Sequence, residues 1–288
     1  MKSILTGICI LLGANVFAQD GSEIYLFDII SKNGMVTLSN PINITNRKGY
    51  DNQPSFDAAN SLIYYSSFNE AGRSDIKSYQ YKTGETKFFT QTQEREYSPT
   101  LTPDKKFISC IIQRDNNAQD LGKYPVKGGT PITIIDNLIV GYHAWVDNNR
   151  LALYVLGEQS TLHLYNLALQ KDTILTKKIR RSLHKIPGTN SITFIEEAGG
   201  KNGIIKKLNP DTFEITDITN IIPGHEDIAW TPDGNIITSD GENIFVFTPG
   251  TDKTWREAVI NTGKEFLKGV TRIAISGDGK KIAIVVAE

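Results

Sequence analysis

A segment of about 44 residues recurs six times along this chain of 288 residues, and its spacing constrains the fold more than any single motif does. Each copy has a short apolar strand ending at an anchor residue, a polar turn, and a second apolar strand. The anchors lie 45, 44, 41, 44 and 45 residues apart, at Phe56, Leu101, Trp145, Ile186, Trp230 and Ile275. Strand-built repeats of about this length are typical of a β-propeller with one blade per repeat. We therefore predict an all-β, six-bladed β-propeller of four-stranded antiparallel blades.

The second repeat shows the expected plan of one blade. Its four strands, from the inside outwards, are predicted at residues 97–101, 107–113, 121–126 and 131–135. In the fifth repeat, residues 254–259 are compatible with a helix, but the period assigns them to the outer strand plus a loop.

The two ends of the sequence predict how the ring closes. After the sixth anchor only one more strand, residues 281–286, is expected, which leaves half a blade missing. That half is found near the start, where residues 23–29 resemble a third strand and 35–38 an outer strand. Because an open ring would expose strand edges, we expect the N- and C-terminal strands to share one blade.

The first residues have the pattern of a secretory signal peptide. Lys2 is followed by an apolar stretch from Ile4 to Leu12, and Ala18 offers a small residue for cleavage. The stretch is too short to span a membrane, which takes about 20 apolar residues. We predict a signal peptide at residues 1–18, a propeller at residues 19–288, and a protein that is exported to the periplasm or secreted.

Charge and cysteine content indicate which classes of partner to expect. Of 31 Lys and Arg residues, Lys2 is lost with the signal peptide, leaving 30 against 32 acidic residues. This near-neutral balance argues against nucleic acid as a partner. No other run is apolar enough for membrane insertion, and Cys110, in an apolar strand, is expected to be a buried hydrophobic residue.

Three of the predicted turns resemble a known motif. Thr102-Pro103-Asp104, Thr231-Pro232-Asp233-Gly234 and Ser276-Gly277-Asp278-Gly279 resemble the S-P-D-G signature of the WD40-like repeats in TolB-type propellers. Residues 120–131 are similar to the third-strand segment of those repeats, and the resemblance covers nearly the whole mature chain. It implies a six-bladed ring in which the motif marks a hairpin turn without chemistry. The family includes periplasmic protein-binding components of the cell envelope, and no segment here resembles the α/β domain that precedes the TolB propeller.

Common catalytic motifs are missing from the sequence. It contains no G-x-S-x-G, H-E-x-x-H, C-x-x-C or P-loop pattern. The aspartate-containing turns also lack the alternating oxygen ligands and distal glutamate of a calcium loop. We therefore expect no cofactor, no metal and no catalytic residues.

One set of polar residues remains as a candidate ligand site. The segments leading into the inner strands should converge on the mouth of the central channel, which is where a small-ligand or metal site could form. The candidate residues there are Asp51, Glu96, Tyr97, His143, Arg181, His184, His225, Glu226, Asp227 and Arg272. His143 and His184 both lie two residues before an anchor and should point the same way, whereas His225 lies five before its anchor, out of register.

Two functions are compatible with these features. The first is an exported, non-catalytic and monomeric propeller that binds a protein or peptide partner in the cell envelope. The second is a lyase or metal-dependent hydrolase that acts at the channel mouth, for which the three histidines are the only support. A fold alone does not decide between them.

Overall fold

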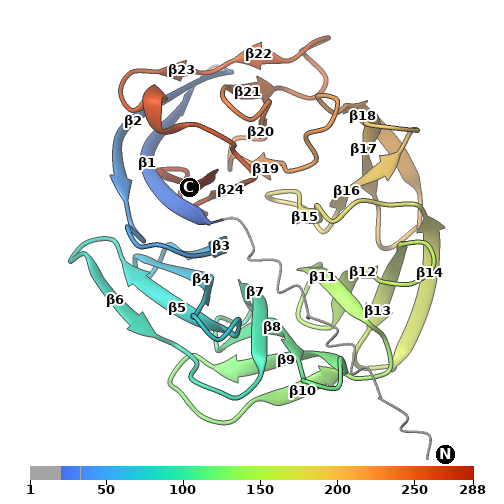
Figure 1. The fold of residues 1–288 in the computed structure, drawn as a ribbon. Helices are drawn as coiled ribbons and strands as arrows, with labels where there is room; N and C mark the ends of the chain where they lie inside the picture. Colours follow the sequence, from blue (N-terminus) through green and yellow to red (C-terminus); the bar gives the residue numbers. More distant parts are fainter. Residues whose placement is uncertain (1–20, 33) are drawn as a thin grey trace, which may run out of the picture.

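The computed structural model describes residues 21–32 and 34–288, so the predicted signal peptide lies outside the described residues. Six small sheets are arranged as blades around a common axis (Figure 1), which confirms the predicted six-bladed all-β propeller. In the described part of the chain, the only helix is the 3₁₀ turn η1 (Lys264–Phe266). No helix among these residues is long and apolar enough to cross a membrane.

Blades one to five each contain four strands that run in chain order from the axis to the rim. Blade one contains β3 (Asp51–Asp57), β4 (Leu62–Phe68), β5 (Ser74–Gln80) and β6 (Glu85–Phe88). Blade two contains β7 (Arg95–Leu101), β8 (Phe107–Gln113), β9 (Gln119–Pro125) and β10 (Ile132–Ile135). Blade three contains β11 (Val140–Trp145), β12 (Arg150–Val155), β13 (Thr161–Asn166) and β14 (Lys171–Lys177). Blade four contains β15 (His184–Lys185), β16 (Ile192–Glu197), β17 (Gly203–Leu208) and β18 (Ile215–Asn220). Blade five contains β19 (Ala229–Trp230), β20 (Ile236–Ser239), β21 (Ile244–Phe247) and β22 (Arg256–Glu257).

Both ends of the chain build the sixth blade, as predicted. Its strands from the axis outwards are β24 (Arg272–Ile275), β25 (Lys281–Ala287), β1 (Ser22–Lys32) and β2 (Met35–Asn43). A short fifth strand, β23 (Val259–Ile260), pairs in parallel with β2. The segment 254–259 therefore forms strand and loop, as expected, and its end crosses to the closing blade.

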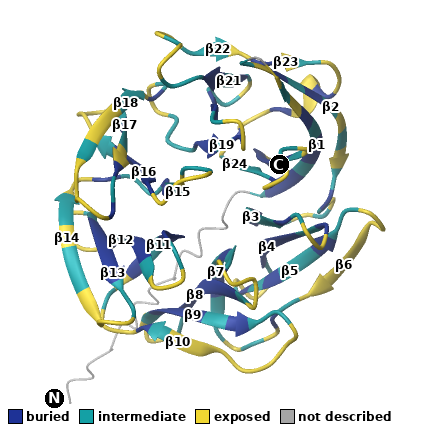
Figure 2. Ribbon diagram, turned by 180° about the vertical axis from the view of Figure 1, so that it is seen from behind, coloured by how far each residue is buried: buried dark blue, intermediate teal, exposed yellow. Residues whose placement is uncertain are grey.

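The second strands are the most continuously buried, the inner strands are partly open to the axis, and the outer strands are the most exposed (Figure 2). The second strand of each blade is a continuous apolar run because neighbouring blades cover both of its faces. In β8, Ile108 and Cys110 are fully buried, whereas every residue of the outer strand β6 is exposed. Burial raises the pKa of the Cys110 thiol well above its ordinary value, so this cysteine is an apolar core residue, as predicted.

The aspartate-containing turns show why the repeat needs these residues. Asp104 accepts hydrogen bonds from the Thr102 hydroxyl at 2.6 Å and from the Lys106 amide at 3.1 Å. Asp278 is held in the same way by Ser276 and Lys280. The residue after the aspartate has a positive φ in all three turns, and two of the three are glycine: Lys105, Gly234 and Gly279. The motif therefore stabilises a hairpin turn, as the resemblance implied.

Two anchor tryptophans join neighbouring blades. The Trp145 indole donates a 2.9 Å hydrogen bond to the Ser109 hydroxyl of blade two, and Ser109 donates to the Thr100 carbonyl at 3.1 Å. Trp230 repeats this link to Thr193 of blade four at 3.0 Å. These bonds fix the inner strands that surround the axis.

Candidate functional site

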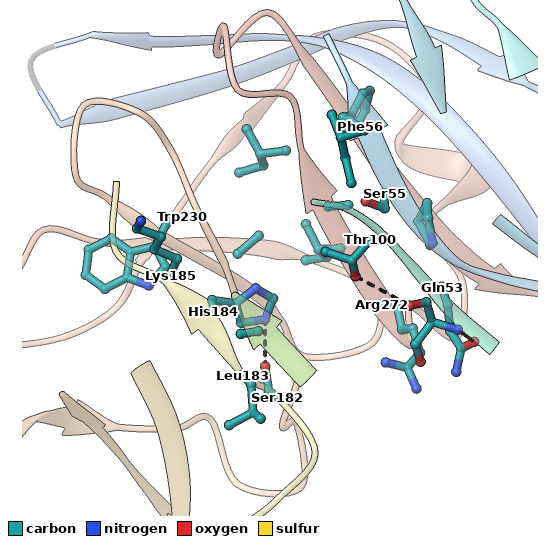
Figure 3. A pocket seen from close by; sticks show the side chains of 18 of the residues that line it. Gln53, Ser55, Phe56, Thr100, Ser182, Leu183, His184, Lys185, Trp230 and Arg272 are labelled. Carbon is teal, nitrogen blue, oxygen red and sulfur yellow. Dashed lines mark hydrogen bonds between the residues drawn. The ribbon is translucent and has the colours of Figure 1, made fainter. Parts of the chain in front are cut away.

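A cavity of about 600 Å³, the central cavity, lies on the axis and is lined by residues of all six inner strands (Figure 3). The strand registers place one residue from each inner strand at the same level. Five of these six are small and the sixth is a histidine: Ser55, Thr100, Ala144, His184, Ala229 and Ala274. Ser55, Thr100, His184 and Ala274 are half-buried and border the open axis, whereas Ala144 and Ala229 are packed into the core between blades.

The registers also correct the predicted anchor of blade four. Lys185 pairs across blade four as Trp145 does across blade three, so the residue equivalent to Trp145 is Lys185 and not Ile186. His143 therefore lies two residues before its anchor and His184 only one. Adjacent positions of a strand face opposite sides, so the prediction that both histidines point the same way is wrong.

His143 is a structural residue between blades. Its Nε2 lies 2.7 Å from the Ser109 hydroxyl of blade two, its Nδ1 has no hydrogen-bond partner in the described part of the chain, and the residue is 7% exposed. Burial lowers the pKa of His143 to about 4, so the ring is neutral at physiological pH. It lies beside the central cavity but is held by the blade contact.

His184 faces the central cavity instead. Its Nε2 lies 3.0 Å from the Ser182 hydroxyl, and in Figure 3 this pair lies across the cavity from Gln53 and Arg272. Burial and the positive charge of Arg272 lower the pKa of His184 to about 4. His184 is therefore a neutral hydrogen-bonding group in the cavity wall.

The mouth of the cavity, where the inner strands begin, carries a buried arginine. Arg272 donates a 2.8 Å hydrogen bond to the Tyr142 hydroxyl and lies over that ring, with 5.1 Å between guanidinium carbon and ring centroid. Its Nη1 is 3.7 Å from Asp227 Oδ2. Burial raises the pKa of Asp227, although the charge of Arg272 opposes the shift. Burial lowers the pKa of the Arg272 guanidinium. Its interactions with Tyr142, Asp227 and Tyr50 raise the pKa by more, so the net shift is upwards.

A second space of about 390 Å³, the side cavity, opens beside the mouth between blades four, five and six. Arg181, Asp227 and Arg272 line both cavities. Arg180 donates a 3.1 Å hydrogen bond to Glu226, and Arg181 Nε lies 3.1 Å from the other oxygen of that carboxylate. Five of the predicted site residues are thus brought together here: Arg181, His225, Glu226, Asp227 and Arg272.

The predicted residues of blades one and two do not line either cavity. Glu96 is fully buried and accepts hydrogen bonds from Thr92 at 2.6 Å, Tyr124 at 2.9 Å and Thr90 at 3.3 Å. Burial raises the pKa of its carboxyl, and the bonds from Thr92 and Tyr124 oppose that shift. This geometry does not support the assignment of Glu96 to a ligand site.

Asp51 and Tyr97 also serve the packing of the first blades. Asp51 is completely buried and forms a 2.8 Å ion pair with Arg47. Tyr97 packs against Phe68 with ring centroids 5.8 Å apart, and burial raises its pKa. Neither Asp51 nor Tyr97 lines the central cavity or the side cavity.

Other residues line the cavity without having been singled out from the sequence. Tyr142 supports Arg272, and Ser98 belongs to a strained backbone segment. Gln53 and Ser98 have φ angles of 59° and 53°, and each lies within a register irregularity of its inner strand. The repeated X-Pro pair, Gln53-Pro54 and Ser98-Pro99, 45 residues apart, was the available signal. Such bulges are common beside binding sites.

A metal site does not fit the side chains of the described residues. No group of three or more His, Cys, Asp or Glu side chains there could hold an ion. His143 contacts blade two, His184 faces the central cavity, and His225 lines only the side cavity. The three histidines therefore do not form a common ligand set.

Comparisons with known proteins agree with the fold. No family model and no curated protein sequence matches this chain. A putative TolB from Agrobacterium tumefaciens superposes with a TM-score of 0.71 at 13% identity, covering 94% of this chain and 99% of the other. TolB from Acinetobacter baumannii gives 0.60 at 13% identity, covering 92% of this chain and 63% of the other. An oligogalacturonate lyase in complex with manganese gives 0.59 at 13% identity, covering 86% and 80%.

The chain therefore has the TolB-like propeller fold that its turn motifs predicted. At 13% identity this likeness is one of architecture. The same architecture occurs in a lyase, so the function has to be argued from the cavities themselves.

Proposed function

We propose that this protein is an exported, non-catalytic propeller that binds a protein or peptide partner in the cell envelope through its central cavity. The observation that carries the proposal is the open cavity on the axis, whose volume of about 600 Å³ is that of a pocket for a small ligand and so has room for a few side chains of a peptide. Six strands position its wall, so the site is built on rigid elements.

The cavity wall combines two kinds of surface that suit a peptide. The anchor side chains Phe56 and Trp230, both half-buried, provide aromatic surface along the axis. Arg181 and Arg272 provide charge at the mouth. Aromatic residues and arginine are the side chains that contribute most at protein interfaces.

The likeness to the two TolB structures supports a binding role, and the predicted signal peptide supports export. The likeness to the lyase favours the enzyme alternative. However, the described residues contain no group of side chains that could hold a metal ion such as the manganese of that lyase. Intact-mass measurement of the exported protein tests the location, because the mature chain should begin at Gln19.

Photo-crosslinking from the cavity tests the binding role. A benzophenone amino acid is placed at Ser55 in blade one or Lys185 in blade four, which line the cavity without being buried in the core, and at Ile174, which is 59% exposed on the outer strand β14, as the control. Both cavity positions should crosslink to the same peptide region of one partner, and Ile174 should not. Crosslinks that form only from Ile174, or turnover of a polysaccharide by the purified protein, would contradict the proposal.

A further inference from the structure

Arg272 is a buried cation with unused hydrogen-bonding capacity. A guanidinium carries five N–H donors. Among the described residues, Arg272 hydrogen-bonds only the Tyr142 hydroxyl, and its 3.7 Å approach to Asp227 is too long for a hydrogen bond. Its side chain is 12% exposed and lies in the wall of both cavities. The unused donors therefore border the cavities, where a ligand can reach them.

Arg181 is in the same situation beside it. Its Nε is buried and lies 3.1 Å from Glu226 but is not aligned for a hydrogen bond. Glu226 is at the same time bound by Arg180. The Arg181 side chain is 34% exposed, so a ligand can reach it.

The local charge favours an anion. Three guanidinium groups, of Arg180, Arg181 and Arg272, face two carboxylates, those of Glu226 and Asp227. Asp227 Oδ1 accepts a 2.8 Å hydrogen bond from the Ile273 amide and its Oδ2 lies 3.7 Å from Arg272, so Asp227 does not hydrogen-bond the guanidinium. Buried charged donors are normally paired, which indicates that a further acceptor belongs here.

We propose that Arg181 and Arg272 form a carboxylate site at the cavity mouth, which binds an acidic side chain or the C-terminal carboxylate of the peptide partner. This inference rests on the proposed function and names the chemistry of its ligand. The planar guanidinium matches a carboxylate with two parallel hydrogen bonds. The nearby carboxylates of Glu226 and Asp227 disfavour a doubly charged phosphate.

Peptide binding to the mature full-length chain tests this site. The probes are fluorescein-labelled (Glu-Ala)₄ and (Gln-Ala)₄ with blocked ends, (Gln-Ala)₄ with a free C-terminal carboxylate, and tetragalacturonate as a non-peptide competitor. We expect (Glu-Ala)₄ to bind about tenfold more tightly than blocked (Gln-Ala)₄ by fluorescence anisotropy, the effect of one charge-assisted hydrogen bond.

Three variants locate the effect. Arg181→Gln should remove most of the preference for glutamate, and Arg272→Lys, which keeps the buried charge but loses the planar fork, should reduce it. Lys87→Gln is the matched control, because it removes one positive charge from a side chain that is 66% exposed on β6. It should leave the preference unchanged.

The outcomes separate this inference from the proposed function. Equal binding of (Glu-Ala)₄, blocked (Gln-Ala)₄ and (Gln-Ala)₄ with a free carboxylate, or a preference for a carboxylate that survives Arg181→Gln and Arg272→Lys, would overturn the carboxylate site and leave a peptide-binding cavity. Binding of tetragalacturonate without any peptide would overturn the peptide partner and the proposed function with it. Failure of every probe to bind would overturn the carboxylate site.

Discussion

The two sides of the cavity mouth are built from the same part of the repeat, yet they use charged residues in opposite ways. On the side of blades one and two, Glu96 is fully buried and bound by three hydroxyl groups. On the side of blades four to six, the Arg272 side chain is 12% exposed, makes one hydrogen bond to the described residues and faces the cavity. The first charge stabilises the contact between blades, and the second is available to a ligand.

The backbone explains part of this difference. The inner strands β3 and β7 have register irregularities at Gln53 and Ser98, just after Asp51 and Glu96. β24 pairs without interruption from Arg272 to Ile275. An extra residue in a strand changes which face the preceding side chains occupy. A position in the repeat therefore does not fix the role of its residue.

The largest effect is expected from opening the sixth blade, which closes the ring that carries both sides of the mouth. Deleting residues 281–288 removes β25, which joins β24 to β1 and buries Ile282, Ile284 and Val286. We expect aggregation or loss of cooperative unfolding, because the ring is opened and strand edges are exposed. Calorimetry of the deletion beside a chain lacking only Glu288 measures this, and an unchanged, monomeric transition would refute the shared blade.

Substitution of Glu96 tests the side of the mouth that is formed by blades one and two. Glu96→Ala leaves the hydroxyls of Thr90, Thr92 and Tyr124 without their acceptor and should cost about 3 kcal/mol of unfolding free energy. Urea unfolding measures the loss, and Glu96→Gln, which keeps one acceptor oxygen, should cost less. Peptide binding should be preserved in whatever fraction remains folded, and its loss would show that the two sides are not distinct.

The two histidines provide a matched comparison between a blade contact and a cavity wall. His143→Ala removes a buried ring bonded to Ser109 and should cost about 2 kcal/mol of stability. His184→Ala removes a half-buried ring at the cavity wall whose hydrogen bond is to the nearby Ser182 hydroxyl, and should cost less than about 1 kcal/mol. Equal losses in urea unfolding would contradict their different registers.

The pH dependence of the His143→Ala effect gives a finer test. In the folded protein the pKa of His143 is lowered to about 4, so protons bind more readily to the unfolded chain below pH 6.5. Its contribution to stability is present above pH 6.5 and is lost as pH falls towards 4, by about 1.4 kcal/mol per unit at most. The destabilisation by His143→Ala should therefore shrink on acidification. A constant difference between wild type and variant would show that the ring is not held neutral.

Arg181→Gln should have the smallest effect on stability. Its side chain is one-third exposed and makes a single ion pair with Glu226, so we expect a change within about 0.5 kcal/mol. Thermal unfolding checks this. A large loss would make Arg181 a structural residue and remove it from the candidate site.

The repeat predicted the ring and its closure, because apolar periodicity reflects how blades pack. It misplaced one anchor, since Lys185 takes the position that tryptophan has in blades three and five. Its amine donates to the Val146 carbonyl of the neighbouring blade, a contact that a hydrophobicity pattern does not reveal. The polar ring was predicted in outline, but the register and bulges that decide which side chains face the axis depend on the folded backbone.

The central claim is that the side of the mouth formed by blades four to six binds the ligand, while the side formed by blades one and two supports the fold. Arginine footprinting tests it: the protein is treated with phenylglyoxal with and without (Glu-Ala)₄, and adducts are located by mass spectrometry. Arg73 and Arg95, which pair with Asp115, are internal controls. We predict that the peptide protects Arg181 and Arg272 and leaves Arg73 and Arg95 unchanged. Unchanged modification of Arg181, or equal protection of all four arginines, would contradict it.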